Sequence, residues 1–122
     1  MTKIAFLFPG QGSQKPGMVR ELFDELTREE KNELEGIFPG LSQAVQSPEK
    51  ADTDHMAAPL VYLSGILSAR LCLDAGIVPS HLAGFSLGEL AALYTAGITK
   101  PYEMHEILAR RTQAMDEACA AQ

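Results

Sequence analysis

The stretch His81-Leu82-Ala83-Gly84-Phe85-Ser86-Leu87-Gly88-Glu89-Leu90 decides the fold class of this 122-residue chain. A short apolar run leads into a Gly-X-Ser-X-Gly pattern, and an apolar helical pattern follows it. Glycines on either side of a serine permit a tight turn between a strand and a helix. Residues 81–85 are therefore predicted to form a strand, and residues 86–96 a helix that ends at Gly97.

A second apolar run, residues 3–8, is stopped by Pro9-Gly10 and is predicted to be a strand buried on both faces, as in a parallel sheet. Helical patterns separate and follow the two strands. This order predicts an α/β fold in which a parallel sheet has flanking helices and residues 1–122 share one core. The predicted helices are 18–26, short surface helices between 27 and 48 with Thr27 and Glu30 as a capping box, a buried helix over 59–75, and a last helix with Thr99 as N-cap.

The composition, 46% hydrophobic and 21% charged, is ordinary for a soluble globular domain. A net charge of −6 argues against nucleic acid or an anionic membrane as a partner. The N-terminal apolar run is too short for a signal peptide or a membrane span, so the protein is expected to be cytoplasmic and unprocessed. Cys72 and Cys119 lack metal-ligand spacing and are expected to be reduced, the alternative being a disulfide between them. No metal and no bound redox cofactor are expected.

Ser86 is the candidate nucleophile. A serine at a strand-to-helix turn lies at the N-terminus of the helix, where backbone N–H groups and the helix dipole favour negative charge. An oxyanion formed by attack on a carbonyl needs stabilisation at such a place. The alternative is a structural turn in which the serine caps the helix and does no chemistry.

The glycine-rich loop Phe8-Pro9-Gly10-Gln11-Gly12-Ser13-Gln14 follows the first strand and is predicted to lie at the same sheet edge as Ser86. A backbone N–H near Gln11 and the N–H of Leu87 are then candidate donors of an oxyanion hole. The alternative is a loop with no function beyond its flexibility. A phosphate-binding loop is disfavoured because the chain has no GxxxxGK[ST] motif.

Arg111 lies in the middle of an apolar stripe on the last predicted helix, whereas Arg110 points away from it. A guanidinium keeps its charge, so an inward-facing one requires an anionic partner. The partner is either a structural carboxylate or a substrate carboxylate held by two parallel hydrogen bonds, and the third alternative is an arginine that extends past its neighbours to solvent. The apolar positions of the stripe are Met104, Ile107, Leu108, Met115, Ala118 and Cys119.

The motifs PGQGSQ (9–14) and GFSLGEL (84–90) together resemble the acyltransferase family of fatty acid and polyketide synthesis, above all its malonyl-CoA:acyl carrier protein transacylases. The resemblance implies an α/β-hydrolase-like large subdomain with an inserted ferredoxin-like subdomain. This chain corresponds to the N-terminal portion of the large subdomain, without the ferredoxin-like part. Ser86 resembles the nucleophile, Gln11 and Leu87 the oxyanion donors, and Arg111 the arginine that binds the malonyl carboxylate.

The resemblance also implies an activity. Ser86 would accept a malonyl group from malonyl-CoA and pass it to the phosphopantetheine thiol of acyl carrier protein, with no bound cofactor. The catalytic histidine would lie beyond Gln122, so the isolated chain is expected to be inactive, and surface left uncovered by the absent half favours self-association. His55, His81 and His105 are predicted to be solvated surface residues.

The sequence departs from the family pattern at two positions, and two alternative functions stay open. Phe85 and Ala58 stand where many family members have histidine and glutamine, which removes polar contacts. A serine esterase or thioesterase would use the same turn with water as the acceptor. A non-catalytic fragment that docks on carrier protein or on a synthase would need no base.

Overall fold

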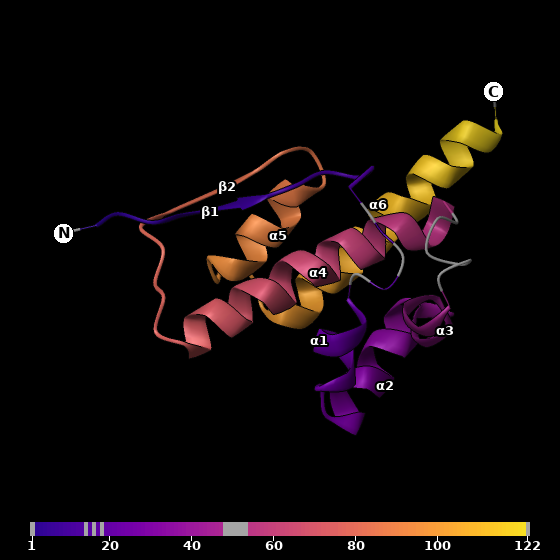
Figure 1. The fold of residues 1–122 in the computed structure, drawn as a ribbon. Helices are drawn as coiled ribbons and strands as arrows, with labels where there is room; N and C mark the ends of the chain where they lie inside the picture. The colour runs from indigo at the N-terminus through magenta and orange to yellow at the C-terminus, as the bar shows by residue number, and fades with distance from the viewer. Residues whose placement is uncertain (1, 14, 16, 18, 48–53, 122) are drawn as a thin grey trace.

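The computed structural model describes residues 2–13, 15, 17, 19–47 and 54–121, and it confirms the predicted α/β class (Figure 1). Two strands pair in parallel, with Ala5 opposite His81 and Phe8 opposite Gly84. The elements in chain order are β1 (Ala5–Phe8), α1 (Arg20–Asp24), α2 (Arg28–Ile37), α3 (Leu41–Gln46), α4 (Asp54–Asp74), β2 (His81–Gly84), α5 (Gly88–Thr95) and α6 (Pro101–Ala120).

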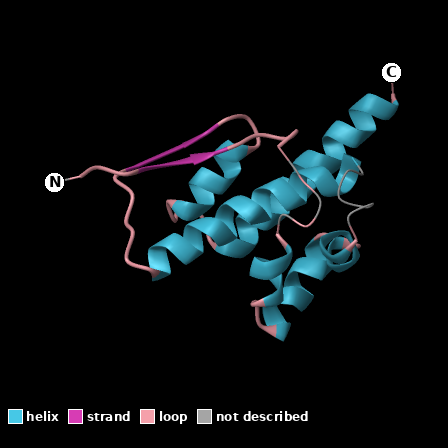
Figure 2. Ribbon diagram, viewed as in Figure 1, coloured by secondary structure: helices cyan, strands magenta, loops and turns pink. Residues whose placement is uncertain are grey.

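Helix α4 is the centre of the fold. The two strands lie on one side of the helices, and α5 packs against both strands and against α4 (Figures 1 and 2). Helices α1, α3 and α6 contact α4 from other sides, which explains why this helix is apolar around its whole circumference. Tyr62 and Leu63, in the middle of α4, are buried in the main hydrophobic cluster.

The long apolar helix begins five residues earlier than predicted, at Asp54, and so contains Pro59 in its interior. By length and composition alone, residues 55–74 are long and apolar enough to cross a membrane. However, 61% of that window is buried against the rest of the chain, as in the core helix of a globular domain.

The sheet is buried on one face only, and the prediction that β1 is buried on both faces is wrong. Phe8 is buried and packs on α4, where a Cβ added at Gly65 would lie 3.0 Å from its ring. Leu7 points the other way and is 76% exposed. The reason is that the described helices cover one face of the two strands and leave the other open.

The helix ends test two capping predictions. The capping box at Thr27 and Glu30 is confirmed, because the Thr27 hydroxyl accepts from the Glu30 N–H at 3.1 Å and the Glu30 carboxylate accepts from the Thr27 N–H. Thr99 is not the N-cap of α6, which is Lys100 without a side-chain cap bond. Pro101 is the first residue of α6 and holds the preceding residue in an extended conformation, which moves the helix start by one residue.

His105 is buried, and the prediction that it is a surface residue is wrong. Its side chain is 7% exposed, its Nδ1 is hydrogen-bonded to Tyr62 Oη at 2.9 Å, and its ring stacks on Tyr94 with centroids 5.4 Å apart. The position three residues before Leu108 is on the core-facing side of α6. The aromatic partners come from α4 and α5, so the pattern within α6 does not reveal them.

This burial predicts a pH-dependent stability. Burial, followed by the charge of Arg70, lowers the pKa of His105 from 6.5 to about 4. Between these values the unfolded chain binds a proton that the folded chain does not, so stability falls as the pH falls. We expect the free energy of unfolding to drop by about 2 kcal/mol between pH 7 and pH 5, at 1.36 kcal/mol per pKa unit.

Urea unfolding at several pH values measures this slope, with His105→Gln as the comparison. The variant should be less stable at pH 7 but should lose most of the slope. The hydrogen bond from Arg70 lowers the pKa of Glu30 below 4.5. Protonation of Glu30 therefore affects stability only at more acidic pH and does not obscure the slope between pH 7 and pH 5. An unchanged slope in His105→Gln would show that another group titrates.

Candidate active site

Ser86 lies in a strained turn between β2 and α5. Its φ is +54°, and among the described residues it is the one non-glycine residue with a positive φ. L-residues with side chains adopt this region at a cost of about 1–2 kcal/mol, so the surrounding structure holds the turn in place. The predicted helix over residues 86–96 therefore starts two residues later, at Gly88, because a helix cannot include this conformation.

Glycines 84 and 88 let the strand, the helix and the first loop approach closely. A Cβ at Gly84 would collide with the backbone of Gly88, and a Cβ at Gly88 would collide with the carbonyl of Phe8. In both cases the obstacle is backbone, which cannot rotate aside. The Gly-X-Ser-X-Gly spacing is thus required by the packing of β1, β2 and α5 around Ser86.

The N-terminus of α5 presents a free backbone donor beside Ser86. The Gly88 N–H donates to the Phe85 carbonyl at 2.9 Å, and the Glu89 N–H donates to the Ser86 carbonyl at 3.0 Å. Within the described residues, the Leu87 N–H donates to no protein acceptor, whereas its side chain is buried. An oxyanion beside Ser86 would find this donor and the positive end of the helix dipole.

The loop after β1 lies against this turn, as predicted. A Cβ at Gly10 would lie 2.9 Å from the Phe85 carbonyl oxygen, so the loop backbone runs directly beside the residue before Ser86. The next residue, Gln11, is exposed, and in the described part of the chain its N–H has no protein acceptor. Ser13 fixes the loop, because its hydroxyl donates to the Gly10 carbonyl at 2.9 Å.

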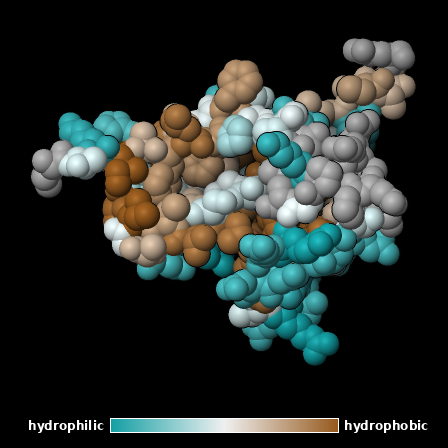
Figure 3. Space-filling view, in the orientation of Figure 1, coloured by the Kyte–Doolittle hydropathy of each residue, from teal (hydrophilic) through white to brown (hydrophobic). Residues whose placement is uncertain are grey.

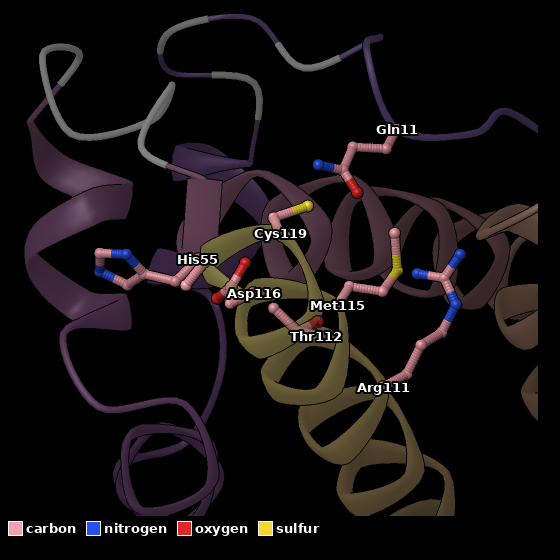
Figure 4. A pocket seen from close by; sticks show the side chains of 8 residues that line it. Gln11, His55, Arg111, Thr112, Met115, Asp116 and Cys119 are labelled. Carbon is pink, nitrogen blue, oxygen red and sulfur yellow. The ribbon is translucent and has the colours of Figure 1, made fainter. Parts of the chain in front are cut away.

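A groove of about 630 Å³ brings Gln11 and Arg111 together (Figure 4). In Figure 4 the side chains of Arg111 and Met115 rise from α6 toward Gln11 on the loop after β1. Ser86 and Leu87 do not line this groove, but the loop that carries Gln11 passes beside Phe85, the residue before Ser86. The other residues along the groove are His55, Thr112, Asp116, Cys119 and Ala120.

One guanidinium nitrogen of Arg111, Nη1, is buried and has no hydrogen-bond partner in the described structure. A buried donor on a permanent cation is costly unless an acceptor reaches it. Among the described residues, no carboxylate is therefore bonded to this nitrogen, as the alternative of a structural ion pair would require. Arg110, by contrast, is exposed.

The predicted apolar stripe around Arg111 is buried only in the first half of α6. Met104 and Leu108 are buried, but Ile107 and Met115 are each 45% exposed. The last turns of α6 extend beyond the body of the fold (Figure 1), and Met115, Ala118 and Cys119 on the stripe are exposed. Sequence reasoning missed Thr112, the residue after Arg111. Its hydroxyl is also buried and has no hydrogen-bond partner among the described residues.

No histidine of this chain is placed to activate Ser86. His81 is exposed at the start of β2, four residues of strand away from the turn, and its Nδ1 is hydrogen-bonded to Ser80 Oγ at 2.9 Å. His55 is exposed and lines the groove, whereas His105 is buried and hydrogen-bonded to Tyr62. Cys72 and Cys119 are both free thiols, and the described residues hold no cluster of metal-ligating side chains.

A serine held at positive φ between a parallel strand and a helix N-terminus defines the class of α/β proteins with a nucleophile turn. The family model described as the acyl transferase domain matches residues 5–122. A malonyl CoA-acyl carrier protein transacylase of Bacillus subtilis is 33% identical over 126 residues, which cover 99% of this chain and 40% of that protein. A non-reducing polyketide synthase of Gibberella fujikuroi is 35% identical over 128 residues, covering 96% of this chain and 6% of the synthase.

Solved structures agree with the family match. The malonyl-CoA:ACP transacylase of Synechocystis sp. PCC 6803 superposes with a TM-score of 0.81 at 30% identity, over 96% of this chain and 41% of that structure. The chain belongs to the acyl transferase domain family. It spans about two fifths of the length of the free-standing transacylases that it matches.

Proposed function

We propose that this chain carries the nucleophile, the oxyanion donors and the carboxylate-binding arginine of a malonyl-CoA:acyl carrier protein transacylase that serves fatty acid biosynthesis. The observation that carries the proposal is Ser86 at φ +54°, next to the unpaired Leu87 N–H. A strained serine beside a preorganised donor is what attack on an acyl carbonyl requires.

The reaction has two steps in this proposal. Ser86 Oγ attacks the thioester carbonyl of malonyl-CoA, the carbon–sulfur bond breaks, and the proton of Ser86 passes through a base to the leaving thiolate. The phosphopantetheine thiol of acyl carrier protein then attacks the serine ester, the carbon–oxygen bond breaks, and Ser86 regains a proton. The N–H groups of Leu87 and Gln11 bind the oxyanion in both steps.

The general base is the missing component, because none of the three histidines approaches Ser86. We place it in the part of an acyl transferase domain that the relatives have and this chain does not include. Without it, an oxyanion hole and binding alone still give about 10³-fold to 10⁴-fold acceleration over water in serine enzymes. In place of the inactivity that the resemblance implied for the isolated chain, this proposal therefore expects slow acylation of Ser86.

The unpaired Nη1 of Arg111 favours a transacylase over an esterase, because it offers an acyl carboxylate a partner beside the active-site loop. Polyketide synthesis is a second candidate process, supported by the 35% identity to the Gibberella synthase. A docking fragment without chemistry would explain the absent base but not the strain at Ser86.

The experiment is a label-and-chase measurement on the folded chain. After incubation with malonyl-CoA, the intact mass should show one malonyl group per chain, and added acyl carrier protein bearing its phosphopantetheine thiol should remove it as malonyl-carrier. Release as free malonate with no carrier product would indicate an esterase instead. A folded chain that binds carrier protein but never acquires the malonyl mass would contradict the proposed chemistry.

A further inference from the structure

Helix α6 carries Arg111, and its buried residues are Met104, His105 and Leu108. Met104 and Leu108 are apolar. Apolar contacts are non-directional, so they determine which side of α6 faces the core but do not fix its rotation closely. An arginine that binds a carboxylate by two parallel hydrogen bonds needs a defined position. The third buried residue, His105, makes a directional contact with another helix.

The His105 ring lies where α4, α5 and the end of α2 meet α6. Its Nδ1 is 2.9 Å from Tyr62 Oη on α4, and the two ring planes are 86° apart. On α5, Tyr94 stacks on the same ring with an interplanar angle of 20°. Helix α2, whose outer surface is hydrophilic (Figure 3), is followed by Phe38, whose ring centroid is 6.5 Å from that of His105. Rings from three other parts of the chain therefore hold the imidazole in place.

The donor of this hydrogen bond is Tyr62. Burial raises the pKa of the Tyr62 phenol, so the hydroxyl keeps its proton, and no other acceptor for it is found among the described residues. Burial lowers the pKa of His105 to about 4, so the imidazole is neutral at neutral pH and its Nδ1 can accept. Hydrogen bonds weaken steeply when their angle departs from the preferred range. The bond therefore restricts both the rotation of α6 and its position along α4.

Arg111 moves with any rotation of α6. It follows His105 by six residues, which is about 9 Å along the helix axis. A side chain at the helix surface is about 6 Å from the axis, so a rotation of about 10° moves it by about 1 Å. A misplacement of about 1 Å can cost about 100-fold in an enzyme. Leu108, three residues from both His105 and Arg111, is fully buried, so this part of α6 transmits a rotation from one position to the other.

Stability alone does not require a polar pair at this place. Replacing both partners of a buried hydrogen bond with apolar groups of the same shape can be nearly neutral. A satisfied buried polar network, by contrast, rigidifies a core and specifies one arrangement of it. This pair joins the central helix of the fold to the helix whose arginine lines the groove. It therefore favours one rotation of α6 over neighbouring ones.

We propose that the hydrogen bond between Tyr62 and His105 positions Arg111 by fixing the rotation of α6, although neither residue lines the groove. This role rests on the proposed function, in which Arg111 binds the malonyl carboxylate. It makes Tyr62 and His105 positioning residues for the choice of acyl group. Loss of the bond should weaken the binding of malonyl-CoA and leave that of acetyl-CoA, whose acyl group has no carboxylate, nearly unchanged.

The test compares the affinities for malonyl-CoA and acetyl-CoA by calorimetry, in a Ser86→Ala background that removes the proposed acyl acceptor. Tyr62→Phe keeps the buried ring and removes Oη, so the preference for malonyl-CoA should fall about 10-fold. Tyr94→Phe is the matched control, because its ring stacks on His105 while its hydroxyl interacts with Arg70. This control should keep the preference of the background chain.

A second variant separates positioning from stability. Tyr62→Phe leaves the buried Nδ1 of His105 unpaired, which lowers the free energy of unfolding. Tyr62→Phe combined with His105→Leu removes both polar partners, so part of the lost stability should return while the preference for malonyl-CoA stays low. Recovery of the preference together with the stability would show that the unpaired nitrogen, not the loss of the bond, disturbed the site. That result would refute the positioning role.

Arg111→Ala in the same background distinguishes a failure of this role from a failure of the proposed function. If Arg111→Ala loses the preference for malonyl-CoA and Tyr62→Phe keeps it, Arg111 binds the carboxylate but the hydrogen bond does not position it. If the background chain shows no preference, or Arg111→Ala retains it, the carboxylate-binding role of Arg111 is wrong and the positioning role fails with it.

Discussion

Replacement of Ser86 by alanine is expected to abolish acylation of the chain by malonyl-CoA, a loss of about 10³-fold or more in labelling rate. The chain has no histidine near this serine, so the remaining acceleration comes from the Leu87 and Gln11 donors acting on an oxyanion formed at Ser86. Without the hydroxyl no such oxyanion forms. Intact mass spectrometry, followed by mapping of the labelled peptide, measures the loss.

The alanine variant should fold normally, because alanine and serine both carry a Cβ and have the same strain at φ +54°. Ser80→Ala is the matched control, since Ser80 is an exposed serine at the opposite end of β2 from the Ser86 turn. It should be labelled at close to the parent rate. Labelling that persists in Ser86→Ala would show that another side chain is the acceptor and would remove the proposed role of Ser86.

The turn around Ser86 could be predicted from the sequence because its constraints are local. Glycines at positions 84 and 88 surround the serine at a fixed spacing, and the structure shows that both are needed for backbone contact. The strand before and the helix after were also predictable from their apolar patterns. The positive φ of Ser86 was not visible in the pattern, so the predicted helix started two residues too early.

The features that the sequence did not predict depend on elements far apart in the chain. His105 is buried because Tyr62 and Tyr94, from two other helices, enclose its ring. Leu7 is exposed because no described helix covers the outer face of β1. An apolar run shows that a strand can be buried on both faces, but it does not show whether the rest of the molecule provides both layers.

The groove beside Gln11 contains one residue that the sequence pattern identified and one that it did not. Arg111 was predictable, because a charge on an apolar helical stripe is anomalous and needs a partner. Its meeting with Gln11 was implied only by the family resemblance, since a hundred residues separate them. Thr112 was missed because a threonine next to an arginine has no distinctive pattern, and its buried, unpartnered hydroxyl is apparent only in three dimensions.

Arg111→Ala is expected to slow labelling by malonyl-CoA about 100-fold while labelling by acetyl-CoA changes little. The buried, unpaired Nη1 of Arg111 is available to a carboxylate in the groove that also contains Gln11. Hydrogen bonds to charged groups contribute about 1.5–3 kcal/mol, which corresponds to roughly 10-fold to 150-fold in rate. Acetyl has no carboxylate and so does not use this interaction.

The comparison of two acyl groups separates carboxylate binding from a general effect on the fold. Arg110→Ala, which removes an exposed charge one residue away, should affect neither substrate. Arg111→Lys keeps the charge but cannot form two parallel bonds, so its malonyl rate should lie between those of the parent and the alanine variant. If Arg111→Ala slows malonyl and acetyl labelling equally, the arginine supports the groove rather than the substrate, and its assignment to the malonyl carboxylate is wrong.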